Sequence, residues 1–285
     1  KAKRTGIRIV DLLDRKDFEE KLRYNISEYN EVLTKIYGHD ELDVDAIVEK
    51  YIEFDKLIDP YVTDISTLLN NYIAEGKEIL VEGAQGALLD LDHGTYPFVT
   101  SSNPTSGGAC TGLGIPPTKV DEIIGIVKAY TTRVGNGPFP TQLNDEVGKQ
   151  LATIGHEFGA TTGRPRRCGW LDLFALKYSV MINGISNIVL TKLDVLDGLE
   201  EIKVCTGYTI NGKTLNSFPV DMQKFNNIEL VYKSFKGWKT DTTQFKSYSA
   251  FPSEVKDYID FIEEFTGARV SMISVSPDRN DTIVR

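Results

Sequence analysis

The chain has 285 residues, of which 41% are hydrophobic and 26% are charged. This is ordinary globular composition, and it excludes a disordered, collagenous or coiled-coil chain. Lys and Arg number 32 against 41 Asp and Glu, which gives a net charge of −9. Most nucleic-acid and anionic-membrane binders carry the opposite sign. The three cysteines form neither a disulfide framework nor a zinc pattern, which favours a reducing, cytoplasmic location.

Residues 1–76 are expected to be helical, because their apolar side chains recur every three or four positions. Gly38 and Gly76 are predicted to end the first and the third helix, Asp43 or Asp45 can cap the second, and Pro60 interrupts it. The spacing predicts three core-facing stripes, formed by Phe18, Leu22, Ile26, Tyr29, Leu33 and Ile36, by Val44, Ile47, Val48 and Tyr51, and by Ile65, Leu68, Leu69, Tyr72 and Ile73.

Near-continuous apolar runs predict buried strands at 78–82, 122–130, 187–191 and 269–275. Because helical stretches separate such runs, they indicate an α/β fold with a mainly parallel central sheet flanked by helices. Asn211 and Gly212 predict a hairpin turn, and the polar, aromatic stretch after them predicts an irregular excursion. We expect a single large α/β domain over 1–285 that consists of a helical region 1–76, a sheet core 77–204, a hairpin or irregular subdomain 205–250, and a helix and strand in 251–285.

The first loop that could carry chemistry follows the strand predicted at 78–82. Ligands collect at the carboxyl ends of strands in open α/β sheets. Small residues at 82–86 permit close backbone approach, and Gln85 offers an uncharged donor and acceptor. Further along, His93 beside Asp92 resembles an acid–base pair, but a histidine at a glycine turn more often has a structural role.

The second loop, 159–167, combines two threonines, a glycine and three arginines in an otherwise acidic protein. Guanidinium groups match the geometry of carboxylates and phosphates in two-point contacts. Pro165 and the flanking glycines restrict the backbone, which favours a rigid anion site. The alternative interpretation is a solvated basic loop.

The third loop contains Thr191, Lys192 and Asp194 directly after an apolar strand. A carboxylate there can accept two hydrogen bonds from the N1–H and amino group of guanine, while the lysine stem covers the base. Many GTPases select guanine with this Thr-Lys-x-Asp pattern. The chain shows neither a Walker-type phosphate loop nor a dinucleotide fingerprint, so a nucleotide site formed by this sequence looks incomplete.

Taken together, these motifs resemble the adenylosuccinate synthetase family, and the resemblance covers essentially the whole chain. The stretches that carry it are 81–86, 92–102, 132–141, 157–164 and 190–198. The resemblance implies a P-loop-NTPase-like architecture and a cytoplasmic homodimer of purine biosynthesis. It also implies GTP-dependent ligation of IMP and L-aspartate to adenylosuccinate, GDP and phosphate, with Mg²⁺.

The resemblance also implies roles for particular residues. Gln85 would stabilise the 6-oxygen of IMP, Thr100 would hold its phosphate, and Val134 and Arg164 would line its pocket. Arg4 would reach the IMP site of the neighbouring subunit. Aspartate would be bound by the segment 160–166, which consists of Ala160, Thr161, Thr162, Gly163, Arg164, Pro165 and Arg166. GTP would be bound by Arg166, Lys192, Leu193, Asp194, Ser274, Val275 and Ser276.

The sequence departs from the family pattern in two ways. Ser276 stands where the family usually has glycine, which alters the packing expected against guanine. The family's phosphate-binding glycine loop, principal catalytic aspartate and Mg²⁺-linked histidine have no counterpart here. No histidine of the chain lies in a motif that matches that of the Mg²⁺-linked histidine. We therefore expect no metal ligands in this chain, with the Mg²⁺ ligands mainly outside it, and no synthetase activity from the 285 residues alone.

Two other functions stay open at this point. The chain could be a non-catalytic fragment for guanine-nucleotide binding or dimerisation. It could also be a GTPase-like switch, but that function leaves the stretches 132–141 and 157–164 without a role. No nucleic-acid or membrane partner is expected.

Overall fold

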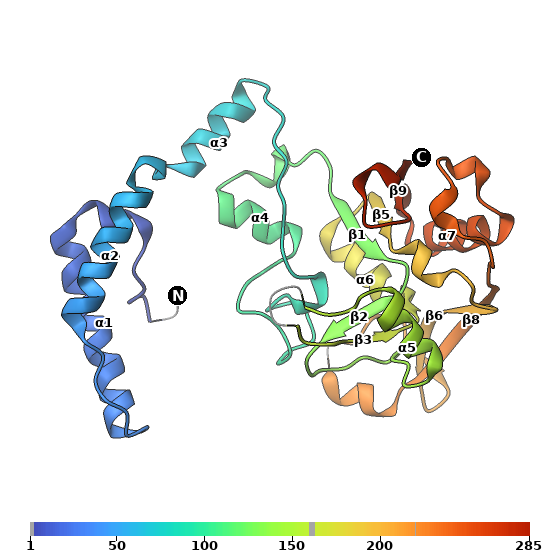
Figure 1. Ribbon diagram of the computed structural model, residues 1–285, viewed down its shortest axis with the longest axis horizontal. Helices are drawn as coiled ribbons and strands as arrows, with labels where there is room; N and C mark the ends of the chain where they lie inside the picture. The colour runs from blue at the N-terminus through green and yellow to red at the C-terminus, as the bar shows by residue number, and fades with distance from the viewer. Residues whose placement is uncertain (1–2, 160–162, 220) are drawn as a thin grey trace. The chain divides into compact units, whose positions relative to one another are not determined.

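The computed structural model describes residues 3–159, 163–219 and 221–285, and it divides into two compact units. Unit 1 is Lys1–Asn71 and unit 2 is Tyr72–Arg285, so the boundary falls within helix α3, Ile65–Ala74 (Figure 1). We had expected a single domain with a helical region ending at residue 76. The helical part forms its own unit because the first two predicted apolar stripes pack on one another. The prediction of a core-facing third stripe was wrong, since α3 has no buried residue, and Tyr29, Ile36 and Tyr51 of the first two stripes are exposed.

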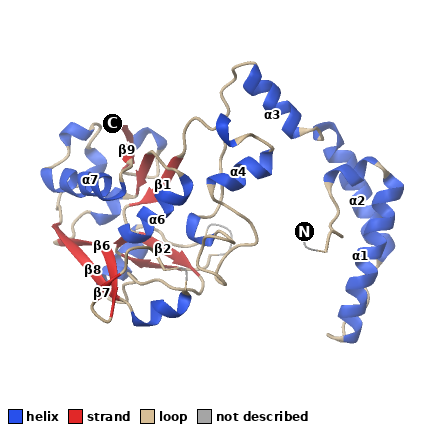
Figure 2. Ribbon diagram, turned by 180° about the vertical axis from the view of Figure 1, so that it is seen from behind, coloured by secondary structure: helices blue, strands red, loops and turns tan. Residues whose placement is uncertain are grey.

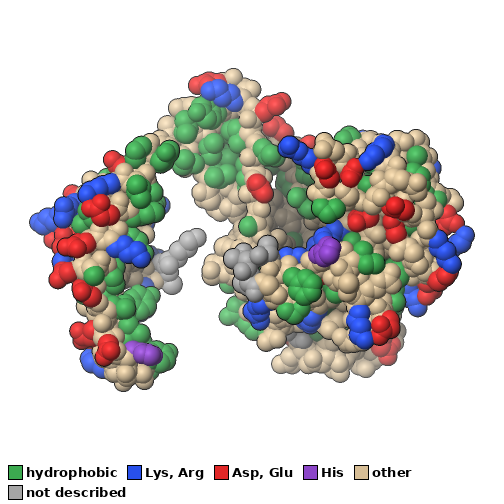
Figure 3. All heavy atoms as spheres, viewed as in Figure 1, with side chains coloured by type: hydrophobic (Ala, Val, Ile, Leu, Met, Phe, Trp, Pro, Cys, Tyr) green, Lys and Arg blue, Asp and Glu red, His purple; other side chains and the backbone are tan. Residues whose placement is uncertain are grey.

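Unit 1 contains the short helix η1 (Ile9–Leu13), helices α1 (Arg15–Lys35) and α2 (Val44–Ile58), η2 (Asp59–Tyr61) and most of α3. Asp43 caps α2 by accepting a 3.0 Å hydrogen bond from the Ala46 amide, as predicted. Gly38 has φ +65° just after α1, which confirms the predicted stop. Figure 3 shows basic and acidic side chains interspersed over this unit. Its core consists of Leu12, Phe18, Leu22, Ile26 and Val48.

Unit 2 holds all the described strands, in mixed sheets with helices beside them (Figure 2). This arrangement confirms the α/β class. The main sheet has the order β1 (Ile124–Lys128), β5 (Asn187–Thr191), β9 (Arg269–Ser274) and β10 (Thr282–Val284); its first three strands are parallel, and β10 is antiparallel. An antiparallel ribbon joins β2 (Thr131–Val134) to β3 (Arg166–Gly169). The third sheet contains β4 (Leu171–Asp172), β6 (Glu201–Ile210), β7 (Lys213–Thr214) and β8 (Glu229–Lys236).

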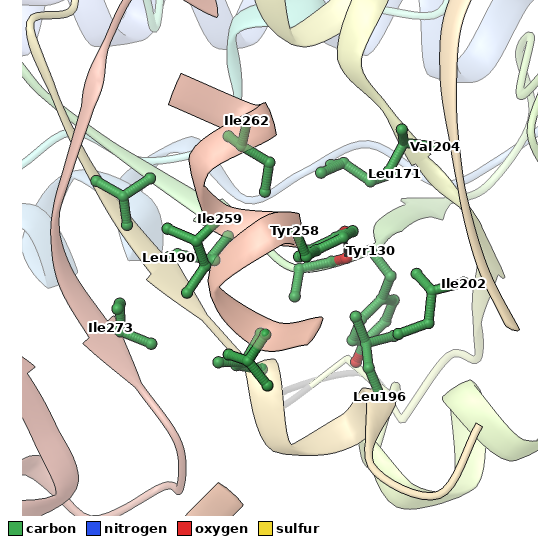
Figure 4. Packing of buried hydrophobic residues seen from close by; sticks show 14 of the residues in the cluster. Tyr130, Leu171, Leu190, Leu196, Ile202, Val204, Tyr258, Ile259, Ile262 and Ile273 are labelled. Carbon is green, nitrogen blue, oxygen red and sulfur yellow. Dashed lines mark hydrogen bonds between the residues drawn. The ribbon is translucent and has the colours of Figure 1, made fainter. Parts of the chain in front are cut away.

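The helices of unit 2 are α4 (Ser106–Leu113), α5 (Glu146–Ile154), α6 (Leu173–Asn183) and α7 (Ser253–Thr266). Helix α7 packs on β8, β9 and α6, and Figure 4 shows its Tyr258, Ile259 and Ile262 among core residues of the strands. None of the helices in the described ranges is long and apolar enough to cross a membrane. The short 3-10 helices are η3 (Ala87–Leu89), η4 (Pro117–Lys119), η5 (Leu193–Leu196), η6 (Met222–Asn227), η7 (Thr242–Gln244), η8 (Tyr248–Ala250) and η9 (Arg279–Asp281).

The prediction of a buried strand at 78–82 was wrong. This stretch has no strand structure, and the Leu80 side chain is 92% exposed. An apolar run becomes a sheet strand only where a neighbouring strand supplies its hydrogen bonds, and no described strand pairs with it. The predicted boundary between 204 and 205 falls inside β6, and β8 lies in the stretch expected to be irregular.

Candidate functional site

Three parallel strand ends meet at one edge of the main sheet. Lys128 at the end of β1 is in register with Thr191 at the end of β5, and Leu190 is in register with Ile273 of β9. The segments that follow β5 and β9 therefore begin side by side. Both were predicted to contact guanine, so the fold brings the two halves of that predicted site together.

A buried carboxylate, Glu157, lies behind this edge, where three side chains donate hydrogen bonds to it and a fourth lies within ion-pair distance. Lys128 Nζ lies 2.8 Å from both of its carboxylate oxygens, and Arg166 NH1 lies 2.8 Å from Oε2. The Tyr130 hydroxyl also donates to Oε1, and Lys192 Nζ is 3.6 Å from Oε1. Glu157 is fully buried, whereas the side chains of Lys128, Arg166 and Lys192 are partly exposed. These three cationic side chains therefore lie between the carboxylate and the solvent.

The electrostatics of this cluster keep Glu157 ionised. Burial alone would raise its pKa, but hydrogen bonds from Lys128, Tyr130 and Arg166 outweigh burial and lower the pKa to about 2. For Lys128, burial lowers the pKa, and Glu157 opposes that shift. Burial and the neighbouring Glu157 raise the pKa of Tyr130, so its hydroxyl stays a donor. The Glu157 carboxylate therefore stays ionised at neutral pH, beside the basic side chains of Lys128, Arg166 and Lys192.

The predicted guanine-binding segment begins at Lys192, which has a left-handed backbone at φ +59°. Its Nζ donates to the carbonyl of Gly155, in addition to its contact with Glu157. Asp194 lies two residues on, at the start of η5, where its carboxyl is half-buried and burial raises its pKa. Leu193 between them is fully buried, which fixes the turn.

The segment after β9 closes on itself through two serines. Ser274 Oγ donates to the Ser276 carbonyl at 2.9 Å, and Ser276 Oγ donates to Asp281 Oδ2 at 2.6 Å. Val275 between them is fully buried. The hydroxyl that distinguishes Ser276 from glycine is therefore turned toward Asp281.

The described residues on either side of 160–162 pair with one another just before β3. The Gly159 amide donates to the Arg164 carbonyl at 2.8 Å, and Phe158 pairs with Pro165. Gly163 has φ +63° and donates to the Gly159 carbonyl. Three predicted residues, Ala160, Thr161 and Thr162, lie outside the described residues.

A second buried carboxylate, Asp90, organises the loop that contains Thr100. It accepts hydrogen bonds from the Asp92 amide at 2.9 Å, the His93 amide at 3.1 Å and the Thr105 hydroxyl at 2.8 Å. Burial would raise the pKa of Asp90, but these bonds and one from the Asn103 side chain lower it to about 2. The Asp90 cluster fixes the path of the loop with local donors.

This loop is joined to the β2–β3 ribbon by Arg133. Arg133 NH2 donates to the Phe98 carbonyl at 3.0 Å and to Thr95 Oγ1 at 2.8 Å, and the Thr100 amide donates to the Leu89 carbonyl. The next residue, Val134, is in register with Arg166 of β3. The Thr100 loop and the Glu157 cluster are thus linked through one ribbon.

Two predicted IMP-binding residues and His93 can also be located. Gln85 is exposed, with φ +63°, just before η3. Arg4 belongs to unit 1, whereas the other predicted site residues belong to unit 2. The backbone of His93 is held at two points, because its carbonyl accepts a 3.0 Å hydrogen bond from the Tyr178 hydroxyl and its amide donates to Asp90.

Sequence reasoning missed the two organising carboxylates. Glu157 lies at the edge of the motif at 157–164, and Asp90 lies two residues before another. A signal existed at Glu157, because an acidic residue directly before a three-arginine loop is a natural counter-ion. Among the residues that the structure describes, no group of three or more His, Cys, Asp or Glu side chains is arranged to hold a metal ion.

Comparison with known proteins gives a consistent result. The family model described as adenylosuccinate synthetase matches residues 1–283. Adenylosuccinate synthetases from Chlorobaculum parvum and Chlorobaculum tepidum are each 56% identical to the chain over all of its 285 residues, which correspond to 66% of each relative. A solved structure, described as fully ligated adenylosuccinate synthetase from Plasmodium falciparum, is 40% identical with a TM-score of 0.94, and the match covers 100% of this chain and 67% of that one. The chain thus spans about two thirds of the length of these curated relatives.

Proposed function

This chain belongs to the adenylosuccinate synthetase family, and we propose that the full-length protein ligates IMP and L-aspartate to form adenylosuccinate, with GTP converted to GDP and phosphate. The observation that carries the proposal is the shared cluster at Glu157. It holds Arg166 of the proposed aspartate segment and Lys192 of the proposed guanine segment on one carboxylate. We further propose that this protein is cytoplasmic.

In the proposed nucleotide site, Asp194 accepts hydrogen bonds from the N1–H and amino group of guanine, and the Lys192 stem covers the base. Leu193 fixes the turn, and Ser274, Val275 and Ser276 contact the other edge of the base. The adjacency of β5 and β9 supports this assignment, because it starts both segments from one sheet edge. Arg166 faces the phosphates of GTP.

In the proposed IMP site, Thr100 holds the phosphate, Val134 and Arg164 line the pocket, and Gln85 donates to the 6-oxygen. The γ-phosphoryl group of GTP passes to that oxygen, where the Gln85 amide stabilises the developing negative charge. The amine of aspartate then attacks C6 of IMP, the carbon that carries this oxygen, so that the C6–N bond forms, the C6–O bond breaks, and phosphate leaves with the oxygen. Arg4 is proposed to reach the IMP site of the second subunit in a homodimer.

The proposed aspartate site is the loop 160–166. Thr161, Thr162 and Arg164 face the two carboxylates of aspartate, while Ala160, Gly163 and Pro165 shape the backbone and Arg166 anchors its end. The anchored position of Arg166 on β3 supports this part of the proposal. Guanidinium and hydroxyl groups suit a dicarboxylate ligand.

Mg²⁺ is proposed to enter with the nucleotide. Because the family's phosphate-binding glycine loop, catalytic aspartate and Mg²⁺-linked histidine have no counterpart in residues 1–285, we assign the Mg²⁺ ligands mainly to groups outside these residues and derive no step through the ion. For the same reason we propose that residues 1–285 alone do not catalyse the formation of adenylosuccinate.

The test is an assay of adenylosuccinate formation from IMP, GTP and aspartate by the full-length protein, with Asp194→Asn alongside. An amide cannot accept both guanine hydrogen bonds but can donate to the 2-oxygen of xanthine. We expect kcat/KM for GTP to fall about a hundredfold, because two charge-assisted bonds are lost, and activity with xanthosine triphosphate to rise. The control is Glu146→Gln, an exposed side chain on α5.

Failure of the wild-type protein to form adenylosuccinate would contradict the ligase. Guanine nucleotide binding without turnover would then favour a non-catalytic binding module. An Asp194→Asn variant with an unchanged nucleotide preference would contradict the base-reading role alone.

A further inference from the structure

We propose that Glu157 is a positioning residue that couples guanine binding to aspartate binding, by holding Lys192 and Arg166 on one carboxylate. This inference rests on the proposed function, since it takes the two cations as parts of the GTP and aspartate sites. Glu157 itself lies behind them, fully buried, so it acts through its partners.

The first support is the origin of the partners. Arg166 comes from β3, Lys192 from the segment after β5, and Lys128 from the end of β1. These elements belong to the ribbon and to the main sheet, and no strand ladder among the described residues joins the two. One side chain therefore links cations from separate sheets, and their spacing depends on it.

The second support is that the carboxylate is shared. Oε1 accepts from Lys128 and Tyr130 and lies near Lys192, while Oε2 accepts from Lys128 and Arg166. A carboxylate offers about four acceptor positions, so these partners fill it. When a ligand anion draws one cation away, the remaining cations gain a larger share of the negative charge. Occupation of one site thus changes the geometry available at the other.

The third support is a second anchor for Lys192, formed by the backbone two residues before Glu157. Its Nζ donates to the Gly155 carbonyl, so one short segment holds the ammonium at two points. Gly155 is tightly enclosed, because an added Cβ would lie 2.1 Å from the Tyr130 hydroxyl and 2.6 Å from the Leu151 carbonyl. The segment 155–157 is therefore fixed against the core and cannot follow the lysine if the lysine moves.

Asp172 shows what a merely structural buried carboxylate looks like in the same unit. It accepts from the Tyr208 hydroxyl and caps α6 through the Ala175 amide. Neither partner belongs to a proposed ligand site. Loss of Asp172 would reduce the folded fraction and leave substrate affinities unchanged, whereas loss of Glu157 is expected to change the affinities themselves.

The experiment measures KM for GTP, aspartate and IMP, and kcat, in full-length wild type, Glu157→Gln and Glu157→Asp, with Glu146→Gln as the exposed control. In Glu157→Gln we expect KM for GTP and for aspartate to rise together, each about tenfold, while KM for IMP changes less than about twofold. Glu157→Asp keeps the charge but withdraws it by one methylene, so we expect about a threefold rise in the same two constants. A purely structural role would lower kcat and leave all KM values unchanged.

Removal of the charge from a buried cluster can also unfold the protein. The double variant Glu157→Gln with Lys128→Met keeps the net charge of the cluster and removes a cation that we assign to no substrate. We expect it to fold and to retain the raised KM for GTP and aspartate.

Three results would overturn the inference: a folded Glu157→Gln or Glu157→Asp variant with wild-type KM values, a rise confined to one of the two substrates, or full recovery in the double variant. Full recovery would show that the net charge of the cluster, and not the position of Lys192 and Arg166, controls the two KM values. A wild-type protein that forms no adenylosuccinate would instead refute the proposed function, so the two failures are distinguishable.

Discussion

Asp90 and Glu157, two of the buried carboxylates of unit 2, are stabilised by different kinds of hydrogen-bond donor. Asp90 is satisfied by neutral donors from its own loop, among them the Asp92 amide and the Thr105 hydroxyl. Glu157 is satisfied mainly by cations from separate strands, with one tyrosine hydroxyl. Both carboxyls have a pKa of about 2, although the donors differ completely.

The difference shows how the partners of a buried charge decide what that charge does. Neutral donors have no net charge left to attract a further ligand once they bind Asp90. Asp90 therefore only fixes the path of the backbone around Thr100. Cations have charge left over, so Lys192 and Arg166 remain attractive to an anion or a polar ligand after they have paired. A carboxylate surrounded by neutral groups shapes a loop, and one surrounded by cations prepares a binding surface.

The largest effect should come from Glu157→Gln. Three cationic side chains would then lie around an uncharged amide, and we expect a loss of about 3 kcal/mol in the free energy of unfolding. Denaturant unfolding of the full-length variant checks this, with Glu146→Gln expected within about 0.5 kcal/mol of wild type. A loss equal to that of Asp90→Asn would remove the distinction between charged and neutral donors.

A smaller effect is expected for Asp90→Asn, about 2 kcal/mol, because the new amide group leaves donors of the loop without an acceptor. The loss should be local. Hydrogen exchange should accelerate at the amides of Asp92, His93 and Thr105, whereas the amide of Arg166 should keep its protection. Faster exchange at Arg166 would show that the two clusters are not independent.

The smallest expected effect is on the loss of folding stability at acidic pH. A depressed carboxyl pKa contributes stability that is present above the unfolded value, here 3.8 for Asp90, and is lost as the pH falls toward the folded value of about 2. Between pH 7 and pH 3 wild type should therefore lose about 1 kcal/mol more stability than Asp90→Asn. Unfolding curves at both pH values test this, and parallel losses in the two proteins would contradict it.

Much of the fold follows from local sequence. The strand predicted at 187–191 matches β5, and the helix predicted within 251–285 corresponds to α7, because apolar periodicity and terminal signals coincide there. Asn211 and Gly212 both have positive φ in the turn between β6 and β7, as the hairpin prediction requires. β8 was missed because most of its side chains are exposed, so alternation is weak.

The site was predictable only in part, for a related physical reason. Motif residues such as Lys192 and Asp194 stand in a recognisable local order, and the loop that holds them could be read from that order. Glu157 acquires its role from Lys128 and Lys192, which are distant in the chain and meet it only after folding. The strand predicted at 78–82 failed likewise, because pairing depends on a neighbour that its own residues do not specify.

Gln85 and Lys192 share a backbone feature with a consequence for evolution of this protein. Both adopt positive φ, a conformation that glycine accepts freely and that costs a side-chain-bearing residue about 1 kcal/mol. Glycine would relieve this backbone cost at both positions, but at position 192 it would also remove the contacts of the Lys192 ammonium with Glu157 and with the Gly155 carbonyl. A less strained backbone is thus one substitution away at Gln85, and that variant would lack the side chain that we propose contacts the substrate.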